Sequence, residues 1–236
     1  MSGPTVLVIR PEPGLTQTVE RAAALGLPLV PAPLFEVEPV AWSAPWAAAY
    51  AGLLAGSANV FRHAGPALRG LAALPVHAVG DATAEAARAS GFAVTATGEG
   101  GLQPLVERLA PGRYLRLAGE ARVPLAAPPG VTIDTRVVYR VTALPLPDAV
   151  RAMLAAGATV LVHSAEAARH FAAEVNRIGL ARGMIALACL APRVAAAAGE
   201  GWRGIAIAPV TDDAALLALA RDLWQTSRKE NGSSSR

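Results

Sequence analysis

Lysine is almost missing from this chain, because only Lys229 among its 21 basic residues is a lysine and the others are arginines. Cysteine occurs once, as Cys189, which excludes an internal disulfide and a multi-cysteine metal site. The apolar run MIALACLA around Cys189 indicates a buried structural thiol. The net charge is only +3 and there is no run of basic residues, which argues against a dedicated nucleic-acid-binding protein. The planar guanidinium group of arginine nevertheless suits carboxylates and phosphates, so the composition is compatible with an anionic ligand.

Long hydrophobic runs are missing too, since proline, arginine or glutamate interrupts each one before it could span a bilayer. The N-terminal sequence MSGPTVLVIRP shows no signal-peptide pattern. We therefore expect no membrane association and a cytoplasmic location. A hydrophobic fraction of 53% with 17% charged residues is typical of a globular protein with a large core.

Nucleotide-cofactor motifs are also absent: neither G-x-G-x-x-G nor G-x-x-x-x-G-K-[ST] occurs, and there is no G-x-S-x-G nucleophile elbow. The four histidines, at positions 63, 77, 163 and 170, lack the spacing of a metal site. We expect no cofactor and no metal, and we expect His63 and His170 to lie on solvated helix faces.

Short apolar runs alternate with alanine-rich helical patterns along almost the whole chain, which predicts an α/β fold with parallel sheets covered on both faces. The predicted strands are 5–9, 53–54, 76–79, 93–96, 114–117, 132–141, 159–162, 185–190 and 205–208. The predicted helices are 15–25, 58–71, 82–90, 102–109, 148–156, 165–178, 193–199 and 213–225.

Two proline-rich stretches, 28–45 and 137–147, interrupt this alternation and favour extended backbone. The residues before the first stretch are too few to bury a core alone, so they should pack with residues after the second. We therefore predict one discontinuous domain (1–35 plus 145–226), one inserted domain (36–144) and a disordered tail (227–236). The two domains would be similar Rossmann- or flavodoxin-like lobes joined by two extended β-strands.

One strand-to-helix corner occurs twice: Ser57 in LLAGSANVFRH has the same setting as Ser164 in VLVHSAEAARH, and both copies end in Arg-His. Each serine could simply cap its helix. The free amides and the helix dipole at such a corner also favour a carboxylate, and the carboxyl edge of an α/β sheet is where ligands bind. A third corner, GDAT, brings Thr83 as a possible donor.

Several segments, in this order, resemble the uroporphyrinogen-III synthase family. They are VLVIRP at the start, SAN from Ser57, HAVGDATA (77–84), LRLAGEAR (115–122), VVYR (137–140) and VLVHSA (160–165). The resemblance extends to about residue 225 and implies the two-lobed architecture described above.

What the resemblance implies is a cofactor-free cyclase that acts on hydroxymethylbilane, a linear tetrapyrrole with eight carboxylates. Loss of its terminal hydroxyl as water creates an electrophile on ring A, ring D attacks through its substituted carbon, and rearrangement inverts ring D. Tyr139 in VVYR matches the tyrosine suspected of assisting hydroxyl departure. A second interpretation is that Tyr139 is only an aromatic residue of a linking strand.

The resemblance also implies substrate-binding roles for Ser57, Thr83 and Ser164, and makes Arg10, Arg116 and Arg122 candidate carboxylate partners. The sequence departs from the family pattern at Gly56, where a hydroxyl residue often stands. APRV (191–194) likewise replaces a G-x-T-T-like turn, where Arg193 is the candidate replacement donor.

The residues by themselves are also compatible with two other functions. One is a non-catalytic two-lobed binding protein for an anionic small molecule. The other is an oxidoreductase, which the absence of a glycine-rich motif disfavours. We expect a monomer that can make transient contact with the enzyme that supplies the substrate.

Overall fold

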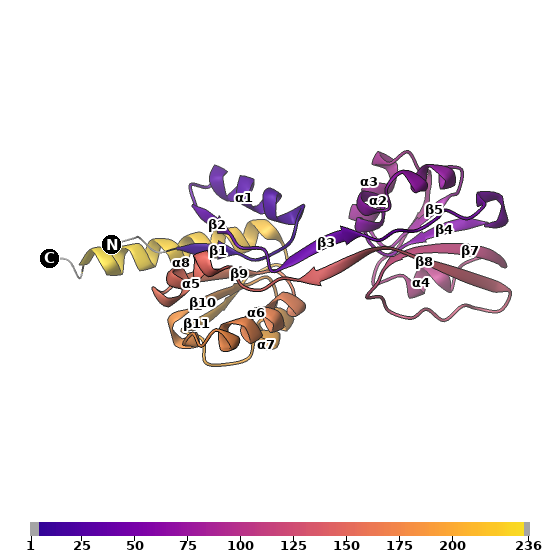
Figure 1. Cartoon of the computed structure of the whole chain (residues 1–236). Helices are drawn as coiled ribbons and strands as arrows, with labels where there is room; N and C mark the ends of the chain where they lie inside the picture. The colour runs from indigo at the N-terminus through magenta and orange to yellow at the C-terminus, as the bar shows by residue number, and fades with distance from the viewer. Residues whose placement is uncertain (1–4, 234–236) are drawn as a thin grey trace. The chain divides into compact units, whose positions relative to one another are not determined.

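The computed structural model of the protein describes residues 5–233. The chain divides into two compact units: unit 1 holds the residues up to Glu36 and from Ala143 onward, and unit 2 is Val37–Thr142. The sequence predicts these boundaries after residues 35 and 144. Both boundaries lie inside strands, β3 (Phe35–Pro39) and β8 (Val131–Ala143), so the chain passes between the units in extended backbone (Figure 1).

Unit 1 is built on a parallel sheet in which the first strand pairs with a strand from far along the chain. The strand order is β11 (Gly204–Ile207), β10 (Ala186–Cys189), β9 (Thr159–Val162), β1 (Val6–Val8) and β2 (Leu29–Pro31). This is the flavodoxin-like order, in which the strand order reverses between β1 and β9. Because β1 and β2 are too short to bury a core, they are completed by the later strands.

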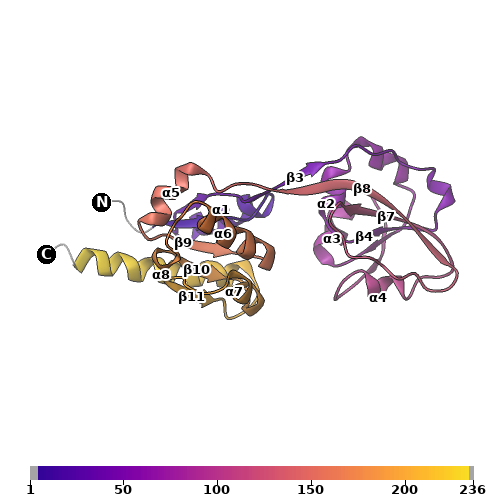
Figure 2. The ribbon, with the colours of Figure 1, turned by 60° about the horizontal axis from the view of Figure 1, so that its bottom comes forward.

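Helices cover both faces of this sheet, as Figure 2 shows. Along β1, Leu7 packs into one apolar cluster, whereas Val6 and Val8 pack into another. This alternation follows from the two-residue period of a strand. The first cluster is covered by α5 (Asp148–Ala155), α6 (Ala165–Arg177) and α7 (Pro192–Ala198), and the second by α1 (Gly14–Ala24) and α8 (Asp213–Ser233).

Unit 2 has a second sheet with strand order β3, β8, β7 (Gly112–Gly119), β4 (Gly52–Ala55), β5 (Val76–Ala78) and β6 (Val94–Thr97). Apart from β3, its strands run parallel in the Rossmann-like order, which reverses between β4 and β7. One face is covered by α2 (Asn59–His63), a 3₁₀ helix (Pro66–Leu71) and α3 (Asp81–Ala89), and the other by α4 (Gln103–Val106). The predicted α/β class with two parallel sheets is confirmed.

Three predicted helices differ from the structure: the predicted helix 102–109 is reduced to α4 (Gln103–Val106), and the predicted helices 58–71 and 213–225 differ as follows. The predicted helix 58–71 is broken at Gly65, whose φ of 66° lies in the left-handed region, and Pro66 then starts the 3₁₀ helix. The helix α8 continues to Ser233, where the sequence analysis expects disorder from residue 227, and residues 234–236 lie outside the described range. A contact between residues one helical turn apart supports this extension, because the guanidinium of Arg228 lies over the ring of Trp224.

Candidate functional site

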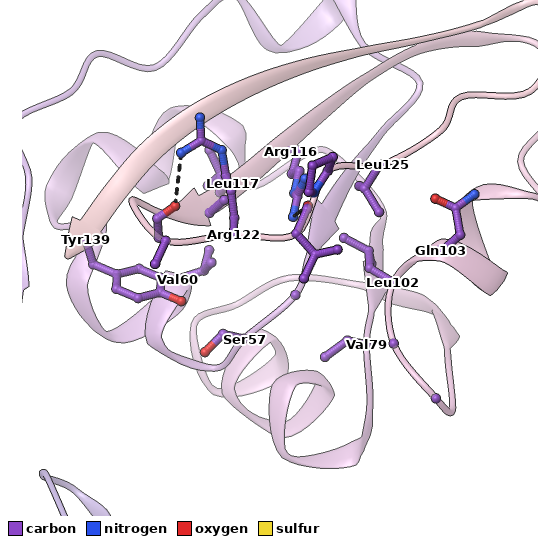
Figure 3. Close-up of a pocket in the computed structure, with 18 residues that line it drawn as sticks. Ser57, Val60, Val79, Leu102, Gln103, Arg116, Leu117, Arg122, Leu125 and Tyr139 are labelled. Carbon is purple, nitrogen blue, oxygen red and sulfur yellow. Dashed lines mark hydrogen bonds between the residues drawn. The ribbon is translucent and has the colours of Figure 1, made fainter. Parts of the chain in front are cut away.

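Unit 2 contains a cavity of about 470 Å³ at the carboxyl ends of its strands, where the strand order reverses between β4 and β7 (Figure 3). This is the edge at which open α/β sheets bind ligands. The lining comes from the residues that follow β4, β5 and β6, from the end of β7 and the loop after it, and from β8. Four predicted site residues lie in this lining: Ser57, Arg116, Arg122 and Tyr139.

Arg116 is a buried arginine without a carboxylate partner in the described part of the chain. Its side chain comes from β7, the residue is 8% exposed, and its Nη2 donates to the carbonyl of Val123 at 2.9 Å. Its Nε is buried and has no hydrogen-bond partner among the described residues. Burial, and next the charge of Arg122, lower the pKa of Arg116. An anion bound next to the Arg116 guanidinium would stabilise its charged form and so offset both effects.

Arg122 stands in the loop after β7, and the hydrogen bonds that it makes with the described residues all go to main-chain carbonyls. Its Nη1 donates to the carbonyl oxygens of Glu120, at 2.8 Å, and Gly119, at 3.4 Å, and Figure 3 shows the second of these bonds. Among residues 5–233, neither Arg122 nor Arg116 has an ion-pair partner. The cavity therefore carries positive charge that the described chain does not neutralise.

Tyr139 lies on β8 and is 9% exposed, with its ring packed in the apolar core of unit 2. The ring centroid is 6.4 Å from that of His63, and the phenol has no hydrogen-bond partner in the described part of the chain. Figure 3 shows the Tyr139 ring and Ser57 at the same end of the cavity. A phenol in this setting can donate a hydrogen bond to a bound molecule.

Ser57 lies at the corner after β4 but does not cap α2. Its hydroxyl oxygen accepts a hydrogen bond from the backbone N–H of Asn59 at 3.2 Å, two residues on, and α2 itself begins at Asn59. The matching Ser164 is a true N-cap, because its hydroxyl accepts from the N–H of Ala167 in the first turn of α6. The two copies of the corner thus share sequence but differ in their hydrogen bonds.

The structure does not bring Thr83 into the cavity. Thr83 stands in the first turn of α3, is 4% exposed and does not line the cavity. Ser164 and Arg193 belong to unit 1, where both side chains are exposed after β9 and β10 respectively. The site residues predicted together therefore fall into two groups, one in each unit.

Arg10, expected to be a carboxylate partner for a ligand, is paired within its own chain. Its Nη1 lies 3.3 Å from Oδ1 of Asp213, the first residue of α8, and donates to the hydroxyl of Thr18. Asp213 also accepts from Thr18 and Arg21 and lies 2.9 Å from Nε2 of His163. This polar cluster joins the segments that follow β1 and β9 to the helices α1 and α8.

Asp213 stays ionised at the centre of this cluster. Its burial favours the neutral acid, but hydrogen bonds from His163, Thr18 and Arg21 outweigh it and lower the pKa of Asp213 to about 2. The carboxylate that Arg10 contacts is thus already present in the folded chain. Sequence reasoning missed this partner because Arg10 and Asp213 are far apart in sequence.

The prediction that His63 and His170 lie on solvated helix faces is wrong. Both are half-buried. His63 packs near Tyr139 of β8, while His170 lies near Phe35 of β3, with its Nε2 2.7 Å from the carbonyl oxygen of Leu144. In each unit, the repeated histidine therefore contacts a segment that leads to the other unit.

Within residues 5–233, no group of three or more His, Cys, Asp or Glu side chains could hold a metal ion. No helix in this part of the chain is long and apolar enough to cross a membrane.

The fold and the cavity define a two-lobed α/β protein with a cationic, tyrosine-containing cavity at the carboxyl edge of one sheet. The family model described as uroporphyrinogen-III synthase HemD matches residues 16–218. The chain therefore belongs to the uroporphyrinogen-III synthase family.

Solved structures show the same fold. The crystal structure of a uroporphyrinogen-III synthetase from Helicobacter pylori is similar with a TM-score of 0.65 and 17% identity, over 93% of this chain and 99% of that one. A mutant uroporphyrinogen III synthase from the extremely thermophilic bacterium Thermus thermophilus is similar with a TM-score of 0.54 and 16% identity, over 94% of this chain and 99% of that one. No curated protein matches the chain.

Proposed function

We propose that this chain acts as a uroporphyrinogen-III synthase whose cavity in unit 2 binds one part of hydroxymethylbilane and assists departure of its hydroxyl. Family membership supplies the reaction: the linear tetrapyrrole closes with inversion of ring D and loss of water. The observation that carries the residue assignment is the unneutralised pair Arg116 and Arg122 in the same cavity as a free phenol.

The arginine pair fits the charge of this substrate. A buried guanidinium without a counter-ion is unfavourable, and a carboxylate supplies both the opposite charge and acceptors for its free N–H groups. The substrate carries eight carboxylates and no positive charge. We therefore assign Arg116 and Arg122 to carboxylate arms of the ring that enters this cavity.

Tyr139 is assigned as the proton donor to the departing hydroxyl. As the C–O bond breaks, the pyrrole pushes electrons toward the carbon, and the phenol gives its proton to the oxygen, which leaves as water. Ring D releases one proton when it regains aromaticity after closure, and this proton restores the phenol. No cofactor is needed for this balance.

Ser57, Ser164 and Arg193 are further proposed substrate-binding groups. Each lies at the carboxyl edge of one of the two sheets. Ser57 has a hydroxyl proton without an acceptor among the described residues, and Ser164 and Arg193 are exposed. Thr83 is not assigned a contact because it is buried outside the cavity. Arg10 is not assigned one because it is already paired with Asp213 within unit 1.

The test is to incubate the protein with hydroxymethylbilane and to separate the product isomers. The uncatalysed reaction closes the ring without inversion, so an excess of the type III isomer supports the enzyme. Type I product alone, at the uncatalysed rate, would leave only the non-catalytic binding protein.

The site in this proposal is formed within one chain, so it requires no second copy. We propose a monomer that works in the cytoplasm and receives its unstable substrate through transient contact with the enzyme that makes it.

A further inference from the structure

Gly119 and Tyr139 face each other across neighbouring strands at the edge of the cavity. They are register partners at the end of the β7–β8 ladder, and the N–H of Glu120 donates to the carbonyl of Tyr139 at 2.9 Å. The register shifts just before this pair: Ala118 is opposite Val137, whereas Gly119 is opposite Tyr139. Such a bulge re-aims the side chains of the strand that carries the extra residue.

The bulge leaves two consecutive residues of β8 buried. Val138 is fully buried and Tyr139 is 9% exposed, although side chains of a regular strand alternate between its two faces. The Tyr139 ring is thereby directed back toward β7 instead of away from it.

The ring occupies the space that a side chain on Gly119 would need. A Cβ atom on Gly119 would lie 2.7 Å from both Cε2 and Cζ of Tyr139 and 3.0 Å from its hydroxyl oxygen. Gly119 does not have a positive φ, so its backbone conformation is open to alanine and only space excludes a larger residue. Carbon atoms in contact are normally about 3.5–4.0 Å apart, so a methyl group would displace the ring by about 1 Å.

We propose that Gly119 is a positioning residue for Tyr139. By lacking a side chain, it lets the ring lie against β7 with the phenol at the cavity. This inference rests on the proton-donor role proposed above for Tyr139. A displacement of about 1 Å can cost about 100-fold in rate when a reacting group loses its alignment.

The experiment compares Gly119→Ala in two backgrounds, the parent protein and Tyr139→Phe. In the parent, we expect kcat for type III product to fall roughly 10- to 100-fold with little change in KM. In the Tyr139→Phe background, where no phenol is left to misplace, the same substitution should reduce kcat by no more than about twofold. The loss of thermal stability should be the same in both backgrounds, because the phenyl ring meets the added methyl either way.

Gly70→Ala is the matched control in unit 2, because a Cβ there meets nothing nearer than 3.7 Å and Gly70 does not line the cavity. It should keep the parent kcat. A spectroscopic readout separates geometry from activity: the chain has three tyrosines, so 3-fluorotyrosine labelling yields three ¹⁹F resonances, and Tyr139→Phe assigns one of them. Gly119→Ala should shift the Tyr139 resonance and leave those of Tyr50 and Tyr114 in place.

An unmoved Tyr139 resonance, a parent-like kcat for Gly119→Ala, or an equal kcat loss in both backgrounds would each overturn the inference. If Gly119→Ala alone unfolds, adding Tyr139→Ala removes the clash: recovery of the fold supports the contact, and continued unfolding contradicts it. A parent protein that makes no type III product would overturn the proposed function and the catalytic part of this inference. The ¹⁹F shift would then still decide whether Gly119 sets the ring position.

Discussion

Glu174 accepts a hydrogen bond from the backbone N–H of Leu146, with 2.7 Å between its Oε2 and that nitrogen. Glu174 is 7% exposed, and Arg177, one helical turn further on, donates to both of its carboxylate oxygens. His170 of the same helix contacts the carbonyl oxygen of Leu144. The helix α6 therefore holds the chain where it enters unit 1 after β8.

Glu174→Gln should destabilise the protein at neutral pH. The hydrogen bonds from Arg177, opposed by burial and supported by the bond from Leu146, lower the pKa of Glu174 to about 2. A group with a lowered folded-state pKa stabilises the fold above its unfolded value, near 4.5, and this contribution is lost as the pH falls toward 2. We expect the free energy of unfolding, measured by chemical denaturation at pH 7, to be roughly 1–2 kcal/mol lower in the variant than in the parent. This difference should become smaller as the pH is lowered from 4.5 toward 2. A loss of equal size at pH 7 and pH 2.5 would show that the charge is not its source.

Tyr139→Phe should reduce turnover while keeping the ring packing. We expect kcat to fall by roughly ten- to a few-hundred-fold, at the lower end of general-acid effects because water partly replaces the phenol. The type III isomer should remain the enzymatic product, since the phenol acts on the leaving group and not on the choice of ring-closing carbon. Tyr50→Phe is the control, because the Tyr50 hydroxyl bonds to Asp134 outside the cavity. Parent-like turnover with unchanged stability would leave Tyr139 as a linking-strand aromatic only.

Arg116→Gln should weaken substrate binding more than it slows turnover. A charged hydrogen bond in a buried site contributes roughly 1.5–3 kcal/mol, so KM should rise by about 10-fold or more. KM of the parent should increase with ionic strength, and this dependence should be shallower in the variant. Arg113→Gln, on the same strand, removes an exposed arginine that pairs with Asp134 and should leave KM near the parent value. Equal effects of the two substitutions would mean that charge at the cavity is not what binds the substrate.

Asp213→Asn should destabilise unit 1. The substitution leaves Arg10 near a neutral amide and removes the charged acceptor shared by Thr18, Arg21 and His163. Breaking a largely buried ion pair from one side costs about 3–5 kcal/mol, and the amide retains an acceptor, so we expect a loss of about 2–3 kcal/mol in denaturant unfolding. Asp222→Asn, on the exposed side of α8, is the matched control and should change stability little.

Much of the fold was predictable because its strands are apolar runs bounded by glycine and proline. The runs around Leu7, Leu54 and Val160 are buried strands, as expected. The strands β2 and β3 escaped prediction as separate strands because they lie in the proline-rich stretch 28–45, which indicates only extended backbone.

The polar residues that line the cavity were predictable from the resemblance, but the pairings of the other candidate residues were not. The resemblance singled out Arg116, Arg122, Tyr139 and Ser57, and the fold brings these four to one cavity. No local signal indicated that Asp213 would pair with Arg10, because that contact depends on how α8 packs against the sheet. Gly119 was visible in LRLAGEAR only as one glycine among 22, since its importance lies in a neighbour on another strand.

The pairing of β1 with β9 has a consequence for synthesis of the chain. The residues that complete β1, around Val160, leave the ribosome only after all of unit 2 has emerged. At about 5–20 residues per second, β1 waits roughly 8–30 s for β9, while unit 2 already has its whole chain available to fold. Throughout that interval β1 can pair only with β2, so the apolar segment Val6–Ile9 lacks one of its two neighbouring strands and is exposed to aggregation or to chaperone binding.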